Sequence, residues 1–212
     1  MPLKLPFDLN EAVACLREHD PRFGAAIDKL GSCTFLLRND SDPFEALLRT
    51  IVYQQLAGSA ARVIHERVLA IAGHPRPDPK QLLRRRDSTL AQAGLSRNKI
   101  AAVRDLARKC VDSEVPDFNS MRHMDNEAIT EQLVKIRGIG PWTVQMLLIF
   151  NLGRPDVFPV SDLGIRKGYQ VIFRSRSLPT EKTLLNRGRR WRPWRSVASW
   201  FLWRVADGSK DW

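Results

Sequence analysis

The stretch Ile136-Arg137-Gly138-Ile139-Gly140-Pro141-Trp142-Thr143 is the segment from which the fold of this chain can be inferred. Two glycines separated by one residue permit a tight turn with positive φ and let a ligand approach the backbone closely. Pro141 suits the first position of a helix. The amides of the turn and of that helix's N-terminus would then form a site for an anion such as a phosphate. On the turn alone, a plain connection between two helices remains an alternative.

Amphipathic patterns on both sides of the turn predict helices. Before it, Ile129, Leu133 and Ile136 share one face, and after it residues 144–150 are apolar nearly all round, which predicts a buried helix. Another helix has the apolar stripe Phe44, Leu47, Leu48, Ile51 and Val52. Ser41 or Asp42 could cap it, with Pro43 in its first turn. Further helices are predicted at about 59–71, 100–110 and 193–206.

No strand alternation or internal repeat is evident. We therefore expect an all-α fold and a single domain over residues 1–212. Within it, two helical lobes, approximately 42–118 and 119–212 plus the N-terminal segment, would flank a cleft.

Asp162 is the acid that stands out after the hairpin. It lies 22 residues after Gly140 and opens a new apolar segment. An Asp in such a place often serves only as a helix N-cap. From the residues alone the cap is the simpler interpretation and a catalytic carboxylate is the alternative, although the two roles are compatible.

Basic residues are concentrated near the C-terminus. The net charge is +11, and the segment 166–204 contains eleven Lys and Arg residues against one acid, Glu181. The same segment includes Trp191, Trp194, Trp200 and Trp203. Arginines interleaved with aromatic residues are typical of nucleic-acid-binding surfaces. A polyanion partner is therefore favoured over an inert, solvated surface.

Several other function classes are disfavoured by composition. No apolar run approaches 18 residues, so no transmembrane helix is expected, and the segment Met1–Pro6 lacks the apolar stretch of a signal peptide. The cysteines are scattered and odd in number, as expected for reduced thiols: Cys15, Cys33 and Cys110. No cysteine follows Cys110, which excludes a cysteine-ligated iron–sulfur cluster from the C-terminal half. The four histidines lack metal-ligand spacing.

Several segments occur in an order that is highly specific. They are Gln54–Ala61, Gly94–Ile100, the hairpin, the region of Asp162, and Trp191–Ser196. In these segments the chain, from about Asp42 to Ala206, resembles the 3-methyladenine DNA glycosylase II (alkylation-repair) family of the helix-hairpin-helix DNA glycosylase superfamily. Larger members carry an additional N-terminal β domain. Because only about 40 residues precede Asp42, we expect the compact form that lacks this domain.

The resemblance implies a role for individual residues. Asp162 would be the catalytic carboxylate, stabilising the positive charge that develops on the sugar as the N-glycosidic bond breaks. Trp142 and Trp203 would line the base pocket, with core aromatics as the alternative. Leu56 would be the wedge that fills the space left by a flipped base, with a core leucine as the alternative. The contacts to DNA phosphates would come from Gly138, Gly140, Thr143, Ser59 and Lys99.

The hairpin glycines, Lys99 and Ser161 each need a further remark. A Cβ at Gly138 or Gly140 would obstruct the turn or the approach of a phosphate. Lys99 could instead be a solvated surface charge. Ser161 stands where some relatives have a second Asp, which puts a two-carboxylate mechanism in question.

Trp142 also bears on the type of reaction. In the bifunctional glycosylase/lyases of the superfamily the matching position holds a lysine that forms a Schiff base, and tryptophan cannot form an imine. The resemblance therefore implies a monofunctional hydrolase without lyase activity. Such an enzyme excises alkylated purines such as 3-methyladenine by base flipping and leaves an abasic site, as part of base excision repair.

The implied partner is double-stranded DNA containing alkylated bases, bound by a monomer without a membrane partner. The implied location is the cytoplasm of a bacterium or the nucleus of a eukaryote. No cofactor or metal is implied, and a structural monovalent cation at the hairpin backbone stays open. The lesion range stays open as well, among 3-methyladenine, 7-methylguanine, ethenoadenine, hypoxanthine and 1-methyladenine.

Two alternative functions remain at this point. One is a glycosylase for oxidised or mismatched bases. The other is a non-catalytic helix-hairpin-helix DNA-binding protein, which would need the hairpin and the positive charge but would have no use for Asp162.

Overall fold

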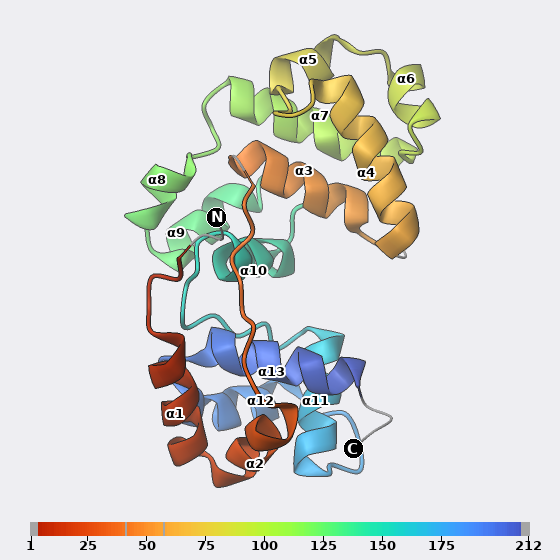
Figure 1. Ribbon diagram of the computed structural model, residues 1–212. Helices are drawn as coiled ribbons and strands as arrows, with labels where there is room; N and C mark the ends of the chain where they lie inside the picture. The colour runs from red at the N-terminus through yellow and green to blue at the C-terminus, as the bar shows by residue number, and fades with distance from the viewer. Residues whose placement is uncertain (1–3, 41, 57, 209–212) are drawn as a thin grey trace. The chain divides into compact units, whose positions relative to one another are not determined.

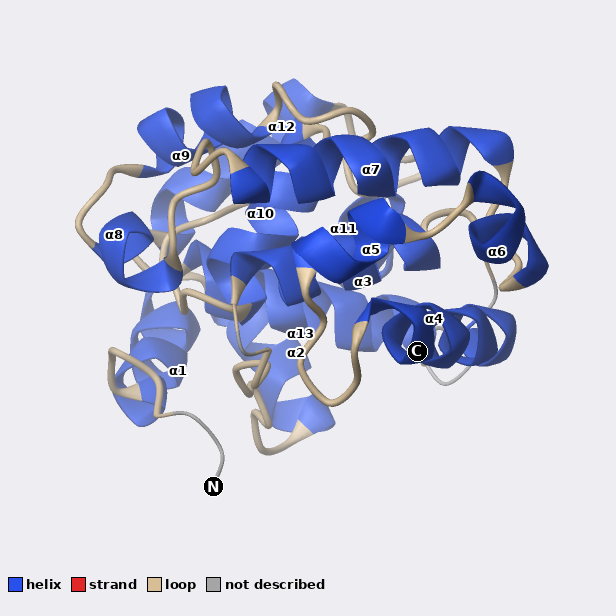
Figure 2. Cartoon of the chain, turned by 90° about the horizontal axis from the view of Figure 1, so that it is seen from above, coloured by secondary structure: helices blue, strands red, loops and turns tan. Residues whose placement is uncertain are grey.

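A computed structural model describes residues 4–40, 42–56 and 58–208, and over these residues it is helical without any strand (Figure 2). The helices are α1 (Leu9–His19), α2 (Pro21–Leu30), α3 (Pro43–Tyr53), α4 (Gly58–Ala72), α5 (Pro79–Arg84), α6 (Asp87–Gln92), α7 (Arg97–Val111), α8 (Phe118–Arg122), α9 (Asn126–Leu133), α10 (Pro141–Phe150), α11 (Leu163–Phe173), α12 (Glu181–Gly188), the 3-10 helix η1 (Arg189–Trp191) and α13 (Arg195–Asp207). The predicted all-α class is confirmed. No helix in the described ranges is long and apolar enough to span a bilayer.

The chain divides into two compact units (Figure 1). The terminal unit consists of Met1–Arg38 and Leu148–Trp212, and holds α1, α2, α11, α12, η1 and α13. The central unit is Asn39–Leu147, and holds α3 to α9 and most of α10. The sequence placed a lobe boundary near residue 118, whereas the central unit continues to Leu147.

Polar contacts explain why the segment after residue 118 stays with the central unit. The side-chain amide of Gln132 donates to the Glu114 carbonyl at 2.8 Å. The backbone N–H of Arg137 donates to the Asp105 carboxylate, also at 2.8 Å. The extended stretch at Val115–Asp117 is therefore a loop inside this unit.

The predicted helices of the central unit form for the expected reasons. Asp42 caps α3 by accepting a hydrogen bond from the Glu45 N–H at 2.9 Å, and Pro43 occupies the first turn. Ser41, the other candidate cap, lies outside the described residues. The predicted stripe of α3 is buried, and this helix packs against α4 and α7. Residues Val144 and Met146–Ile149 of α10 are buried, as their uniformly apolar sequence predicts.

In the terminal unit, α11 and α13 pack face to face without space for a side chain between them. A Cβ built on Gly168 would lie 2.0 Å from the carbonyl oxygen of Leu202. Only glycine fits at this crossing, because any larger residue would force the two backbones apart. The surrounding core includes Leu16, Phe23, Ile165, Trp191, Phe201 and Val205.

A fully buried acid joins the N-terminal helices to α12 and η1. Asp20 accepts hydrogen bonds from the Arg187 guanidinium at 2.5 and 2.6 Å, from the Trp191 indole N–H at 3.1 Å, and from the Phe23 N–H at 3.3 Å. The paired charge and the additional donors satisfy this carboxylate away from water. The sequence did not predict α1 or α2.

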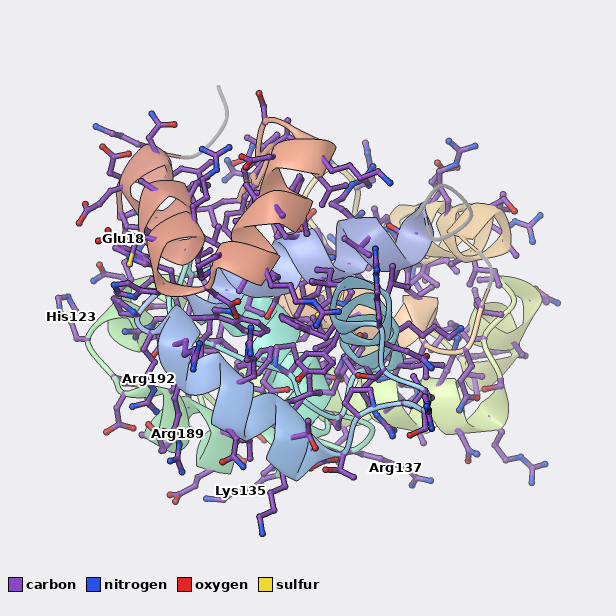
Figure 3. The ribbon with its side chains drawn as sticks, turned by 90° about the horizontal axis from the view of Figure 1, so that it is seen from below. Glu18, His123, Lys135, Arg137, Arg189 and Arg192 are labelled. Atoms are coloured by element: carbon purple, nitrogen blue, oxygen red, sulfur yellow. The ribbon has the colours of Figure 1, made fainter. Side chains whose placement is uncertain are left out.

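The basic, tryptophan-rich segment is in part structural. Trp191 is completely buried, and the Arg195 guanidinium forms a two-point ion pair with Asp156. Arg189 and Arg192, by contrast, project from the surface (Figure 3). The interleaving of arginine with tryptophan, taken from the sequence as a sign of a nucleic-acid surface, is therefore explained at Trp191 and Arg195 by packing.

Candidate functional site

The hairpin between α9 and α10 forms the predicted tight turn. Gly138 has φ +80°, a value that favours glycine, and the Ile139 N–H donates to the Ile136 carbonyl at 3.0 Å. Helix α10 begins at Pro141, and the Val144 N–H closes its first turn on the Gly140 carbonyl at 3.2 Å. The first amides of an α-helix have no acceptor in a preceding turn, which makes this end of α10 suited to an anion.

The two hairpin glycines differ in what they require. A Cβ on Gly138 would lie 3.1 Å from the Ala102 side chain and would sit on a backbone with positive φ. Gly140 lacks a positive φ, and nothing within 4 Å would meet its Cβ. A Cβ would therefore obstruct the turn itself only at Gly138, and at Gly140 the predicted constraint is the approach of a phosphate.

Two side chains fix the turn to the rest of the central unit. The Gln54 side-chain amide donates to the Gly138 carbonyl at 2.9 Å, from the end of α3. Asp105 on α7 holds the Arg137 N–H. The backbone of the turn is thus bonded on both sides by groups distant in sequence. Neither Gln54 nor Asp105 was assigned this role from the sequence, because no local pattern marks a contact across 84 or 32 residues.

Lys99 has a structural role that the sequence did not suggest. Its ammonium donates to the carbonyls of Val52 and Gln54, at 2.7 and 2.8 Å. A positive charge at the C-terminus of α3 satisfies carbonyls that the helix leaves open and complements its dipole. Burial lowers the pKa of Lys99 from its ordinary value. The alternative of a freely solvated charge is therefore wrong, and one N–H of the ammonium is left for the predicted phosphate contact.

Leu56 lies at the exposed tip between α3 and α4. Its exposed fraction is 38%, and its N–H donates to the Tyr53 carbonyl at 3.3 Å. The preceding Gln55 has φ +57°, which turns the chain sharply after Gln54. The alternative of a core leucine is thus wrong, while the wedge role of Leu56 stays a prediction.

The other two predicted phosphate contacts differ in accessibility. Ser59 is exposed in the first turn of α4, where a helix presents open amides. Thr143 is only 3% exposed in the first turn of α10. The side chain of Thr143 is therefore unavailable to a phosphate, and of the two residues only Ser59 presents its side chain to solvent.

Asp162 caps α11 in the terminal unit. Its Oδ1 atom accepts hydrogen bonds from the Ile165 N–H at 2.9 Å and from the Trp203 indole N–H at 2.8 Å. The side chain is half-buried. The helix cap that the sequence offered as the simpler interpretation is confirmed, and the second donor fixes the carboxylate from α13.

Gly164 is what allows the indole of Trp203 to reach this carboxylate. A Cβ at Gly164 would lie 2.7 Å from the Trp203 ring. Gly164 and Gly168 are four residues apart, so they share one face of α11, and that face receives α13. The position of the carboxylate therefore depends on two glycines that bring the helices close together.

The two candidate pocket tryptophans are in different environments. Trp142, in the first turn of α10, is 40% exposed, so the alternative of a core aromatic is wrong for this residue. Trp203 is half-buried, with its ring centroid 5.7 Å from that of Phe150. Asp162 and Trp203 belong to the terminal unit, and Leu56, the hairpin and Trp142 belong to the central unit.

Comparison with known proteins identifies the family. Residues 48–193 match the HhH-GPD superfamily of base excision DNA repair proteins. The DNA-3-methyladenine glycosylase 1 of Schizosaccharomyces pombe is 34% identical over 166 residues, which are 78% of this chain and 73% of that protein. The chain belongs to the HhH-GPD superfamily of base excision DNA repair proteins.

Two solved structures are similar over nearly the whole chain. One is the 3-methyladenine DNA glycosylase of Schizosaccharomyces pombe in complex with abasic DNA, with a TM-score of 0.84 and 30% identity over 93% of this chain and 97% of that chain. The other is a DNA-3-methyladenine glycosidase from Bacillus halodurans, also with a TM-score of 0.84, and 31% identical over 100% of this chain and 94% of that one.

The difference between the two hairpin glycines predicts different effects on stability. Gly138→Ala should lower the free energy of unfolding by about 1–2 kcal/mol, because alanine would be forced into the left-handed region. Gly140→Ala should change it by less than about 0.5 kcal/mol, because its Cβ meets no atom. Chemical denaturation of both variants measures the difference. Equal destabilisation would contradict the assignment of positive φ to Gly138 alone.

Proposed function

We propose that this protein is a DNA-3-methyladenine glycosylase. It hydrolyses the N-glycosidic bond of alkylated purines in double-stranded DNA and leaves an abasic site for base excision repair. The observation that carries the proposal is the carboxylate of Asp162, held by two N–H donors at the N-terminus of α11 in a chain of this superfamily. The names of the relatives that are at least 30% identical support alkylated purines as the substrate.

The chemistry of the bond explains why a fixed carboxylate suffices. Positive charge builds on the sugar as the base leaves, and a carboxylate whose position is already set stabilises that charge without reorganising. The Ile165 and Trp203 donors hold Oδ1 of Asp162 in this way. An alkylated purine such as 3-methyladenine already carries positive charge. It therefore leaves readily, with little need for a general acid.

The target nucleotide has to leave the duplex before its sugar can reach a protein carboxylate. Leu56 is the apolar side chain suited to fill the vacated space, because it is exposed at a tip that protrudes after α3. Lys99 and Gln54 brace that tip, and Gln54 also binds the hairpin carbonyl. The wedge and the phosphate site of the hairpin are thus held in one rigid network of the central unit.

Trp142 occupies the position that in lyases of this superfamily holds the Schiff-base lysine. An indole nitrogen cannot attack the sugar to form an imine. The enzyme is therefore proposed to be monofunctional. Trp142, with 40% of its surface exposed, is also proposed to stack on the flipped, positively charged base.

Asp162→Asn tests the catalytic assignment. Asparagine keeps an oxygen that can accept both hydrogen bonds, so α11 stays capped while the negative charge is removed. Release of 3-methyladenine from alkylated duplex DNA, followed in single turnovers, should fall by roughly 100-fold or more. Affinity for undamaged duplex should be retained. Asp207→Asn, at the exposed end of α13, is the matched control and should release base normally. Turnover by Asp162→Asn close to that of the control would refute the assignment.

The absence of lyase activity predicts the outcome of a trapping experiment. Sodium borohydride reduces an enzyme–DNA imine to a stable covalent adduct, and Trp142 offers no amine to form one. Incubation with alkylated duplex DNA should therefore yield base release and intact abasic sites without an adduct on a denaturing gel. A bifunctional glycosylase is the positive control. An adduct at the yield of that control would show that another amine performs lyase chemistry.

Leu56→Ala should slow excision from duplex DNA more than from single strands, because a wedge matters only where a base stack has to be replaced.

Lys99→Gln should likewise slow excision from duplex DNA more than from single strands, because it releases the carbonyls that hold the tip. The ratio of the two excision rates is the measurement for both variants, with thermal unfolding as the control for folding. If Lys99→Gln instead slows excision equally on both substrates and makes the slope of log affinity against log salt shallower by roughly 0.9, Lys99 is a phosphate contact only.

A further inference from the structure

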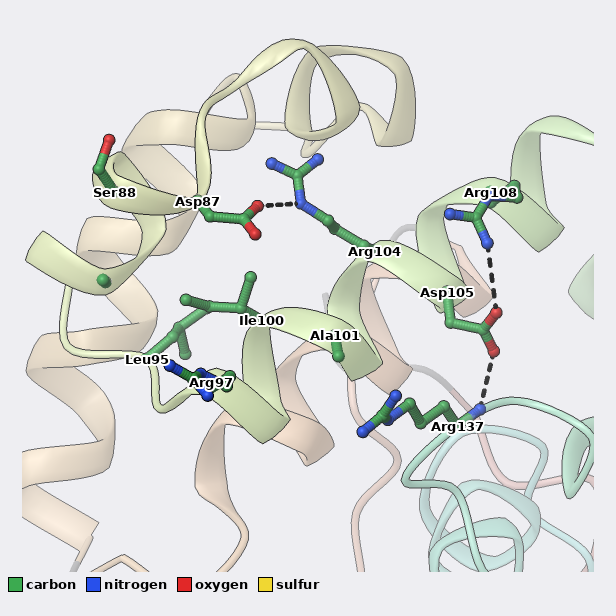
Figure 4. A pocket seen from close by; sticks show the side chains of 11 residues that line it. Asp87, Ser88, Leu95, Arg97, Ile100, Ala101, Arg104, Asp105, Arg108 and Arg137 are labelled. Atoms are coloured by element: carbon green, nitrogen blue, oxygen red, sulfur yellow. Dashed lines mark hydrogen bonds and ion pairs between the residues drawn. The ribbon is translucent and has the colours of Figure 1, made fainter.

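A second polar site lies beside the hairpin, in a pocket of about 580 Å³ in the central unit (Figure 4). One face of α7 forms much of its lining, since Arg97, Ala101, Arg104 and Arg108 follow at helical spacing. Arg137 enters it from the hairpin, and Asp87 from the start of α6. None of these residues has a part in the excision chemistry described above.

The acids of this pocket are already neutralised. Asp87 accepts a hydrogen bond at 2.5 Å from Arg104, whose guanidinium also donates to the carbonyls of Leu83 and Arg85. Asp105 lies 3.8 Å from the Arg108 guanidinium and accepts the Arg137 N–H at 2.8 Å. Arg104 and Arg108 therefore balance the two carboxylates.

Two positive charges are left over. The side chains of Arg97 and Arg137 are exposed, and within the described ranges neither guanidinium has an acidic partner. Figure 4 shows Arg97 at the start of α7, near Leu95, and Arg137 beside Ala101 on the same helix. Ile100 and Leu95 add apolar surface to the lining. A phosphate group fits between two such arginines, because guanidinium groups bind phosphate oxygens in pairs.

We propose that this pocket binds a second backbone phosphate of the DNA, next to the phosphate held at the hairpin turn. The inference rests on the proposed function for the identity of the polyanion. Arg137 directly precedes Gly138, so the pocket continues the hairpin site along the chain, and Asp105 fixes that junction. Such a contact positions the duplex without reading its sequence. The site thereby lengthens the stretch of DNA backbone that the central unit holds.

The test uses Arg97→Gln, Arg137→Gln and the double variant, with Arg84→Gln as the matched control. Arg84 is an exposed arginine in the last turn of α5, outside the pocket. Affinity for an undamaged duplex is titrated at several salt concentrations. The slope of log affinity against log salt should become shallower by roughly 0.9 for each phosphate that the variant no longer neutralises, whereas Arg84→Gln should leave it unchanged. The duplex is also shortened from one end. Once the second phosphate has been removed, the wild type and the double variant should have the same slope of log affinity against log salt.

Thermal unfolding confirms that the variants fold, and the single variants are tested alone if the double variant does not. An unchanged slope in folded Arg97→Gln and Arg137→Gln would overturn the inference. Binding of inorganic phosphate or a nucleoside monophosphate to the pocket, with an unchanged slope for duplex, would overturn DNA as the source of the phosphate.

Base release by the wild-type protein is measured separately, which keeps the two proposals distinguishable. If the wild-type protein releases 3-methyladenine and the arginine variants keep the wild-type salt dependence of DNA binding, only the phosphate-binding role of the pocket is refuted. If the variants show a weaker salt dependence and the wild-type protein releases no base, the role of the pocket is supported and the glycosylase activity is refuted.

Discussion

The two hydrogen bonds accepted by Oδ1 of Asp162 are the interaction on which the candidate active site depends. One donor is the Ile165 N–H of the same helix, and the other is the Trp203 indole on α13. The indole reaches the carboxylate only because Gly164 and Gly168 leave no side chain between the helices. A carboxylate held from two directions is prepared for a cation before the cation forms, and such preorganisation is the source of electrostatic catalysis. Under the proposed function, the close α11–α13 packing is therefore a requirement of the chemistry as well as of the fold.

The residues of the central unit that are proposed to contact DNA are also held by hydrogen bonds. Lys99 ties the end of α3 to the start of α7, Gln54 ties it to the hairpin, and Asp105 holds the hairpin to α7. The exposed leucine tip and the hairpin turn are thus parts of one hydrogen-bonded frame. Under the proposed function, such a frame would let a phosphate contact at the turn set the position of Leu56, because little freedom remains between the two. The half-buried Lys99 is the residue that closes this frame.

Local patterns in the sequence were sufficient for the helix class, the hairpin and the cap at Asp162. Each of these is encoded within a few residues, as in Asp42 before α3 or Gly138 in the turn. Contacts between distant residues were not predictable. Asp20 and Arg187 are 167 residues apart, and Lys99 reaches Val52 across 47. The roles of α1, α2 and Lys99 follow from such pairs. The sequence also could not show that Thr143 is buried while Ser59 is exposed, because both are small hydroxyl residues near a helix start.

The most direct test of the central claim compares two abasic-site analogues in duplex DNA. One carries a cationic pyrrolidine in place of the sugar and mimics the positive charge of the transition state, and the other carries an uncharged tetrahydrofuran. Electrostatic stabilisation by Asp162 predicts that the wild-type protein binds the cationic analogue at least about tenfold more tightly, and that the preference disappears when residue 162 is asparagine. Equal affinity of the wild-type protein for the two analogues would contradict the account.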